Sequence, residues 1–278
     1  MTARPPDWLI GLGVVGALIG AAIVLPFWLR DSAAAGGGQA APPSSSHATP
    51  ATSLLDPTIT VDVPSGAGPG AGTAFSISAG GMWMTARHVV EGCAHTAIVV
   101  GPGQGVAAEV RIDPHGETAV LITQGGAPAL PIAPRDSLRH GMTAFHAGFP
   151  QGHPGQVSSR LLRRETLVLR GRRTRHESVL AWSESDDEGP IPPSLAGLSG
   201  APALDSQGRV IGVTIAQSRR HGQIYTTTPT ALRMAIIRAH IEPATGARAA
   251  PMSPGSYSRI SAVLRGNLRI VPVVCLAG

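Results

Sequence analysis

Ser199 lies in the glycine-rich segment Gly197–Pro202 and is the first candidate for chemistry in this sequence. Flanking glycines let the backbone come close to a bound substrate, and peptide N–H groups in a Gly-x-Ser turn can point at a carbonyl oxygen. Any glycine-rich turn could carry a serine, so the motif is weak alone. It becomes informative only with a base that accepts the hydroxyl proton.

His88 is the candidate base, because it follows a predicted strand and opens a helical turn within the segment Thr85–Val90. Imidazole has the side-chain pKa nearest to neutral pH, as a general base requires. Such a base needs a third, acidic group, here between histidine and serine in the sequence. The order His, acid, Ser is that of chymotrypsin, and Gly197–Ala201 lacks the final glycine of the hydrolase elbow G-x-S-x-G.

The elements that would position these residues are short strands. The chain has 35 Gly and 25 Pro with few charged or aromatic residues, which is typical of many turns. Predicted strands lie at 72–77, 82–85, 97–100, 107–112, 119–122, 143–147, 166–169, 179–182, 203–204, 210–215 and 224–227. Strands at this spacing predict an all-β sandwich or a pair of barrels. One helix is expected from Pro229 to His240.

The net charge is +5 and the pI about 10.4, and the excess comes from arginine because lysine is absent. Much of it lies in the segment Arg160–Arg175, where arginine alternates with Leu and Val and no aromatic residue intervenes. This pattern favours a solvated strand face over a nucleic-acid or membrane surface. We therefore expect no nucleic-acid partner.

The segment Trp8–Leu29 is uncharged, apolar and long enough to cross a bilayer as a helix. A cleavable signal peptide, with a cleavage site near Ser32–Ala35, is the alternative, but the apolar run is longer than such peptides usually carry. A retained anchor is therefore favoured. The residues that follow, to Pro57, are rich in Ala, Gly, Pro and Ser and predict a flexible linker.

Several motifs share one family order and spacing. They are Gly72-Thr73-Ala74-Phe75, Trp83-Met84-Thr85-Ala86-Arg87-His88-Val89-Val90, Glu117-Thr118-Ala119-Val120-Leu121, Gly148-Phe149-Pro150, Gly197–Pro202 and Gly212-Val213. Together they resemble the trypsin-like peptidase family, and most nearly its bacterial envelope branch, the HtrA-type proteases. The resemblance implies two six-stranded antiparallel β-barrels of the chymotrypsin type, with the site between them and a C-terminal helix.

The resemblance also implies roles for single residues. His88 would be the base, Ser199 the nucleophile, and the N–H groups of Gly197 and Ser199 the oxyanion hole. Where the family has aspartate this chain has Glu117, whose extra methylene moves the carboxylate; Asp113 is a less favoured substitute. This departure leaves a weak or inactive protease-fold protein that binds peptides or partner proteins as the alternative.

The primary specificity pocket would be built by residues before the serine and by the strand after it. These are Pro193, Ser194, Thr214, Ile215 and Ala216. None is acidic, which argues against cleavage after Arg or Lys. We therefore expect an uncharged pocket for small or apolar side chains.

Cys93 and Cys275 are too few for a disulfide scaffold and lack zinc-site spacing. They could form one bridge in an oxidising compartment, pinning the C-terminal segment near the loop of His88. Free buried thiols are the alternative.

The sequence thus predicts a cytoplasmic N-terminus (1–7), a transmembrane helix (8–29), a linker (30–57), a trypsin-like domain (58–242) and a C-terminal tail (243–278). About 35 residues follow the predicted helix, too few for the PDZ domain that often accompanies such proteases. The resemblance implies a serine endopeptidase in the bacterial inner membrane, its protease domain in the periplasm, acting in protein processing or quality control. Proteins or peptides would be the substrates, and Ser/His chemistry needs no metal or cofactor.

Overall fold

The structure is a computed structural model and describes residues 56–62, 70–134, 138–170, 174–185, 194–242 and 247–276. The chain divides into residues 1–44 and 45–278, and every described residue belongs to the second unit. The predicted membrane helix 8–29 lies outside the described residues. Within the described ranges, no helix combines the length and apolar character needed to cross a membrane.

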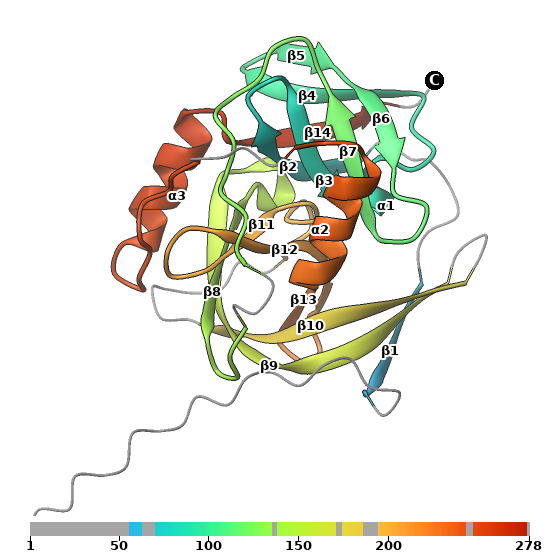
Figure 1. The fold of residues 1–278 in the computed structure, drawn as a ribbon, viewed down its shortest axis with the longest axis vertical. Helices are drawn as coiled ribbons and strands as arrows, with labels where there is room; N and C mark the ends of the chain where they lie inside the picture. Colours follow the sequence, from blue (N-terminus) through green and yellow to red (C-terminus); the bar gives the residue numbers. More distant parts are fainter. Residues whose placement is uncertain are drawn as a thin grey trace, which may run out of the picture. The chain divides into compact units, whose positions relative to one another are not determined.

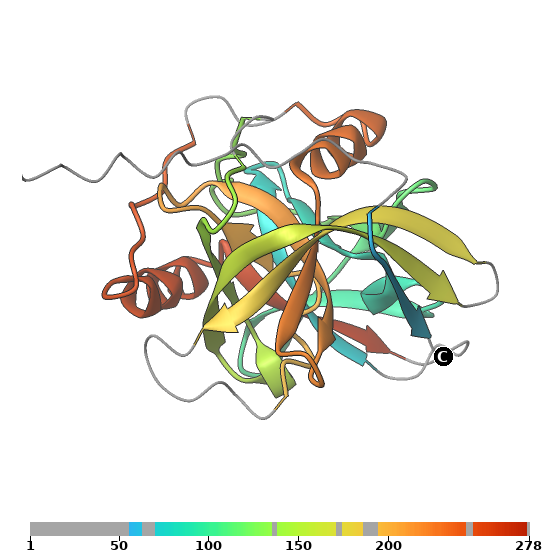
Figure 2. The ribbon, with the colours of Figure 1, turned by 90° about the horizontal axis from the view of Figure 1, so that it is seen from below.

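One sheet contains most of the C-terminal half of the domain (Figures 1 and 2). Its strands are β1 (Thr58–Asp62), β8 (Thr143–Gly148), β9 (Gly155–Arg170), β10 (Arg175–Ser185), β11 (Pro202–Leu204), β12 (Val210–Ser218) and β13 (Gln223–Thr227). The order is β1-β9-β10-β13-β12-β11-β8, and β8 also pairs with β9, so six strands close into a ring. We call this ring the C-terminal barrel. Strand β1 adds to β9 in parallel, outside the ring.

The second sheet, here the N-terminal sheet, is built mainly from the first half of the domain. Its strands are β2 (Gly70–Ser78), β3 (Met82–Ala86), β4 (His95–Gly101), β5 (Gln104–Ala107), β6 (Glu109–Ile112), β7 (Thr118–Ile122) and β14 (Ile270–Leu276). Their order is β5-β4-β14-β2-β3-β7-β6. The last strand of the chain therefore lies between β4 and β2, as Figure 1 shows.

Strand formation follows the apolar pattern of the sequence, because β-branched and aromatic side chains suit a half-buried pleated surface. The larger core cluster includes Phe75, Met84 and Leu121 from the N-terminal sheet, all fully buried. The smaller cluster lies within the C-terminal barrel and includes Trp182 and Ile211. These two cores fix the position of the strand ends that carry the candidate site.

Among the described residues, three α-helices accompany the strands: α1 (Arg87–Val90), α2 (Pro229–Arg238) and α3 (Tyr257–Gly266). A short 3₁₀ turn, η1, spans Pro150–Gly152. Helix α2 begins as its sequence predicts, with proline in the first turn and the Thr228 hydroxyl accepting a hydrogen bond from the Ala231 N–H at 3.1 Å. Helix α3 was not predicted. It packs on β8, where the ring of Tyr257 stacks on Phe145 with centroids 5.1 Å apart.

The prediction of a mostly β, chymotrypsin-like fold is confirmed, but details differ. The stretch predicted as one strand, 107–112, is two strands separated at Ala108, whose N–H donates to the Thr96 carbonyl at 2.9 Å. Within the described ranges each sheet has seven strands where six were expected, because β1 adds to the C-terminal barrel and the other sheet counts β5 and β6 separately. The predicted tail, 243–278, contributes strand β14, which pairs with β2 on one side and β4 on the other.

Candidate active site

His88 lies at the junction of β3 and α1, where the strand ends and the chain turns into one helical turn. The next two residues, Val89 and Val90, are buried and anchor this turn to the core. The His88 side chain itself is 24% exposed, so its ring is fixed on one side and accessible on the other. A general base requires both properties.

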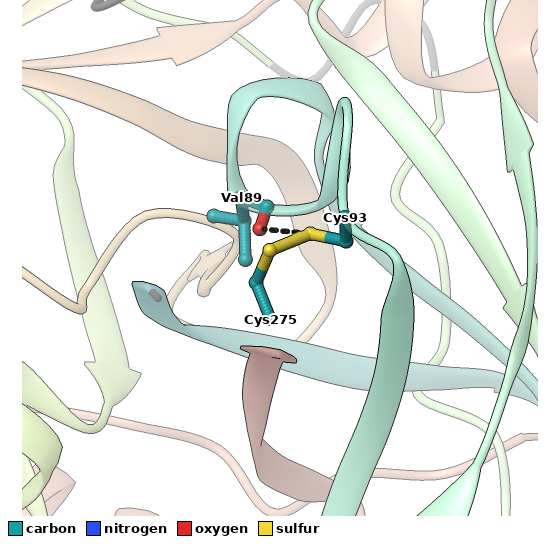
Figure 3. The surroundings of a disulfide bond; sticks show 3 residues. All are labelled: Val89, Cys93 and Cys275. Atoms are coloured by element: carbon teal, nitrogen blue, oxygen red, sulfur yellow. Dashed lines mark hydrogen bonds between the residues drawn. A yellow bond between two sulfur atoms is a disulfide. The ribbon is translucent and has the colours of Figure 1, made fainter. Parts of the chain in front are cut away.

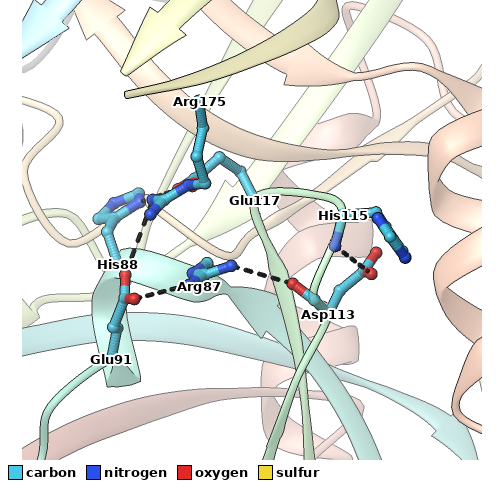
Figure 4. Close-up of polar contacts among 7 residues, drawn as sticks. All are labelled: Arg87, His88, Glu91, Asp113, His115, Glu117 and Arg175. Atoms are coloured by element: carbon cyan, nitrogen blue, oxygen red, sulfur yellow. Dashed lines mark hydrogen bonds and ion pairs between the residues drawn. The ribbon is translucent and has the colours of Figure 1, made fainter. Parts of the chain in front are cut away.

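Glu117 directly precedes β7, the strand that pairs with β3. The two strand ends meet there, and the Arg87 N–H donates to the Glu117 carbonyl at 3.0 Å. The Glu117 side chain is 1% exposed, and its Oε2 lies 3.6 Å from His88 Nδ1 (Figure 4). The structure therefore brings the predicted acid to the predicted base.

Asp113, the less favoured alternative acid, is engaged elsewhere. Its carboxylate accepts hydrogen bonds from Arg238 of α2, with Nε–Oδ1 at 2.9 Å and Nη2–Oδ2 at 2.5 Å. Its contact with the segment of His88 runs through its backbone carbonyl, which accepts a hydrogen bond from Arg87 Nη1 at 3.1 Å. Asp113 thus ties α2 to the N-terminal sheet, and Glu117 is the acid at His88.

Arg175, at the start of β10, binds the other oxygen of Glu117. Its Nε donates to Oε1 at 2.9 Å, and its Nη2 donates to the same oxygen. The guanidinium also lies 3.6 Å from Glu91 Oε2, and Arg87 binds Glu91 Oε1 at 2.7 Å. Figure 4 shows Arg175 reaching between the carboxylates of Glu117 and Glu91. The hydrogen bond from Arg87 to Glu91 raises the pKa of the Arg87 guanidinium.

Glu177, two residues further along β10, contacts the backbone of Glu117. Its Oε2 accepts the Glu117 N–H at 2.7 Å. Burial raises the pKa of the Glu177 carboxyl to about 8, and the nearby charge of Glu117 acts in the same direction. The C-terminal barrel therefore holds Glu117 by its backbone through Glu177 and by its side chain through Arg175.

Ser199 comes from the loop before β11, and the structure docks this loop onto β2. The Thr73 N–H donates to the Ser199 carbonyl at 2.8 Å, and the Thr73 hydroxyl donates to the Gly197 carbonyl at 2.8 Å. The same Thr73 hydroxyl accepts a hydrogen bond from the Phe149 N–H at 3.1 Å. A threonine of the N-terminal sheet thus fixes the serine loop of the other half.

Two glycines permit this docking. Gly200 has φ +90°, and a Cβ there would lie 2.0 Å from the Thr73 carbonyl oxygen and 2.4 Å from Thr85 Oγ1. A Cβ at Gly72 would lie 2.5 Å from Val89, the neighbour of His88, and 3.1 Å from the Ser199 carbonyl oxygen. The backbones of the two segments therefore pack closely, and this brings the backbone of Ser199 to the segment that carries His88.

The two donors of the predicted oxyanion hole are the N–H groups of Gly197 and Ser199. Among the described residues, neither the Gly197 N–H nor the Ser199 N–H donates a hydrogen bond. Gly197 has φ +93°, and a Cβ there would lie 2.6 Å from the Phe149 carbonyl oxygen, so glycine is required. These two N–H groups remain available to a substrate carbonyl.

A pocket of about 280 Å³ opens beside Ser199. Its lining residues are Ser194, Leu195, Ala196, Leu198, Ser199, Thr214, Ala216, Gln217, Arg219 and Ile224. Three of the predicted pocket residues, Ser194, Thr214 and Ala216, line it, whereas Pro193 lies outside the described residues. Ile215 does not, because successive side chains of a strand point to opposite faces and its side chain packs into the larger core cluster.

The sequence predicted an uncharged pocket. The structure differs, because the exposed Arg219 is among the residues that line it. Gln217 is the other polar residue that sequence reasoning missed. Its Oε1 accepts the Leu195 N–H at 3.2 Å and its Nε2 donates to Glu184 at 2.8 Å, which fixes this wall. Arg219 makes no ion pair within the described part of the chain.

Figure 3 shows Cys93 and Cys275 joined by a disulfide, with their Cα atoms 5.4 Å apart. The bond links the loop that follows α1 to β14. The carbonyl oxygen of Val89 lies 3.6 Å from Cys93 Sγ. The last strand of the chain is therefore covalently attached five residues after His88.

Sequence comparison agrees with this geometry. Residues 72–213 match the trypsin-like peptidase domain. Because the match covers half of the chain, the protein belongs to the trypsin-like peptidase family. This confirms the resemblance inferred from the motifs. No curated protein matches the chain.

Several solved structures are similar. The active form of the Rv3671c protease from M. tuberculosis has a TM-score of 0.52 at 18% identity, over 73% of this chain and 97% of that one. An inactive form of the same protease has a TM-score of 0.49 at 21% identity, over 62% and 83%. The HtrA-type protease AlgW with a decapeptide has a TM-score of 0.48 at 22% identity, over 60% and 51%. At these identities the likeness concerns the fold alone.

Proposed function

We propose that this protein is a serine endopeptidase that hydrolyses peptide bonds through Ser199, His88 and Glu117. The observation that carries the proposal is the imidazole of His88 facing the buried carboxylate of Glu117 at 3.6 Å. An acid at Nδ1 leaves Nε2 as the nitrogen that accepts the serine proton. Hydrogen bonds at a catalytic site are often long without substrate and shorten when it binds.

The chemistry then proceeds in two steps. Ser199 Oγ attacks the peptide carbonyl carbon while His88 Nε2 takes its proton, and the carbonyl oxygen becomes an anion bound by the Gly197 and Ser199 N–H groups. The C–N bond breaks as His88 returns the proton to the leaving amine. Water, deprotonated by His88, attacks the acyl group and releases the acid and the free serine. The Glu117 carboxylate stabilises the imidazolium in both steps.

The pocket beside Ser199 would receive the side chain that precedes the cleaved bond. Its walls combine apolar residues with the hydroxyls of Ser194 and Thr214, and Arg219 is its one charged lining residue among those described. A basic side chain would meet like charge there. Small uncharged and acidic side chains fit this chemistry better than Arg or Lys.

We also propose that residues 8–29 anchor the protein in the bacterial inner membrane and that the protease domain lies in the periplasm. The length and apolar character of that segment support the anchor. The disulfide between Cys93 and Cys275 supports an oxidising compartment. A role in envelope protein processing or quality control follows from the HtrA-type resemblance. Resistance of the full chain to carbonate extraction, with the domain accessible to protease in spheroplasts, tests this placement.

The alternative is a protease-fold protein that binds peptides without cleaving them. The glutamate at position 117 favours it, because the family carries aspartate there. Fluorescein-labelled casein incubated with the purified full chain and with Ser199→Ala separates the two. Internal cleavage by the wild type, mapped by mass spectrometry and lost in Ser199→Ala, supports the endopeptidase. Binding of casein by both forms without any cleavage supports the alternative.

A further inference from the structure

We propose that Arg175 is a positioning residue for the reaction proposed above, on which this inference rests: it holds Glu117 so that one carboxylate oxygen faces His88. The arginine comes from the C-terminal barrel, whereas His88 and Glu117 belong to the N-terminal sheet. It therefore connects the half that supplies Ser199 to the base and acid that would activate it.

The two oxygens of the Glu117 carboxylate are divided between two partners. Arg175 donates hydrogen bonds to Oε1 from both Nε and Nη2. Oε2 is buried and accepts no hydrogen bond from any described residue, and it lies 3.6 Å from His88 Nδ1. A buried carboxylate oxygen without a donor is costly. A movement of the His88 ring toward it would satisfy that oxygen and form the bond that the triad needs.

The longer side chain explains why this acid needs an additional partner. Glutamate has one more rotatable bond than the family's aspartate, so its carboxylate can occupy more positions. Catalytic geometry tolerates little displacement, since a shift of about 1 Å can cost on the order of 10²-fold in rate. A guanidinium that grips one oxygen with two donors removes this freedom.

Arg175 is itself held in place. It begins β10, where its Cα pairs with Leu169 of β9, and Leu169 pairs in turn with Val61 of β1. Its guanidinium also meets Glu91, which is fixed by Arg87 of α1. The β9–β10 hairpin, whose two long strands run side by side in Figure 2, thus presents Arg175 to the N-terminal sheet.

Another ion pair in the same hairpin provides a matched control. Arg163 Nη2 binds Oε1 of Glu165 at 2.6 Å, and Glu165 is buried like Glu117. Arg163→Gln therefore removes one positive charge and an ion pair to a buried glutamate from the same hairpin. Arg163 neither lines the pocket beside Ser199 nor contacts the residues around His88.

The test measures kcat and KM for fluorescein-labelled casein with the full chain. We expect Arg175→Gln to lower kcat by on the order of 10²-fold while KM stays the same. Arg175→Lys keeps the charge but loses the pair of donors. Its kcat should lie between those of the wild type and Arg175→Gln. In a Glu117→Ala background Arg175→Gln should cause no further loss, since the two residues act as one unit. Arg163→Gln should leave kcat unchanged.

Near-UV circular dichroism and thermal unfolding establish that each variant is folded, and Arg175→Lys carries the test if Arg175→Gln does not fold. Unchanged or increased kcat in a folded Arg175 variant overturns the inference while the proposed function stands. An equal loss of kcat in Arg163→Gln also overturns it, because the effect would then be general to the hairpin. No turnover by the wild type contradicts the proposed function and this inference together.

Discussion

Glu117 Oε2 lies 3.6 Å from Nδ1 of His88, in a position where the trypsin-like family carries the shorter aspartate. The carboxylate is fully enclosed, and its second oxygen is held by Arg175. The extra methylene is therefore accommodated by a partner from the opposite half of the domain. This contact is the basis of the proposal that Glu117 serves where the family carries aspartate.

Substituting the acid tests its role directly. Glu117→Gln should lower kcat by on the order of 10⁴-fold with little change in KM, because the amide favours the wrong imidazole tautomer and cannot stabilise the imidazolium. Glu165→Gln provides the control, since Glu165 is an equally buried glutamate paired with an arginine. Casein hydrolysis rates measure both. A Glu117→Gln enzyme as fast as the wild type would remove Glu117 from the triad.

The raised pKa of Glu177 predicts a pH-dependent stability. Below pH 4.5 the folded and unfolded states both carry its proton; between 4.5 and about 8 only the folded state keeps it. Stability therefore falls as pH rises through this window, by up to about 1.4 kcal/mol per pH unit, and this contribution stops changing above it. Urea unfolding at several pH values should show a smaller decline in Glu177→Gln. Parallel curves for both proteins would show that Glu177 ionises normally.

The disulfide predicts a covalent contribution to stability. It closes a loop across a sequence separation of 182 and fastens β14 to the segment after α1. Replacing both Cys93 and Cys275 with serine should lower the free energy of unfolding by about 2–5 kcal/mol. Guanidinium unfolding of the wild type with and without reductant should show the same loss. Equal midpoints for all samples would mean that the bond adds nothing.

Arg219 predicts a cleavage preference. Because Arg219 lines the pocket beside Ser199 and has no ion-pair partner among the described residues, Arg219→Glu should increase cleavage after Arg and Lys and reduce cleavage after Glu. A peptide library read by mass spectrometry measures the change. Arg220→Glu, the same charge change at the adjacent residue outside the lining, is the control. Identical profiles for the wild type and Arg219→Glu would exclude this residue from specificity.

Sequence reasoning found what local patterns encode. The short apolar runs between Gly and Pro turns predicted most strands, and the motifs around His88 and Glu117 predicted two residues that the structure brings together. The three consecutive pocket residues were less well predicted, since Ile215 points into the core while Thr214 and Ala216, on the opposite face of β12, line the pocket.

What the sequence could not supply depends on non-local pairing. Arg175 lies in an arginine-rich stretch where no local feature separates it from its neighbours, and only the β9–β10 hairpin brings it to Glu117. The place of strand β14 between β4 and β2 is likewise set by partners far away in the chain. Thr73 supports the serine loop through contacts that no motif reveals.

The most direct test of the central claim is labelling of the full chain with a fluorescent fluorophosphonate, which traps only an activated serine. We predict that the wild type is labelled and that Ser199→Ala is not. Ser218→Ala should be labelled like the wild type, because the Ser218–His221 pair, at 2.9 Å, is an exposed serine–histidine contact outside the site. A folded wild type that resists labelling, or a label that persists in Ser199→Ala, would contradict the claim that Ser199 is the activated nucleophile.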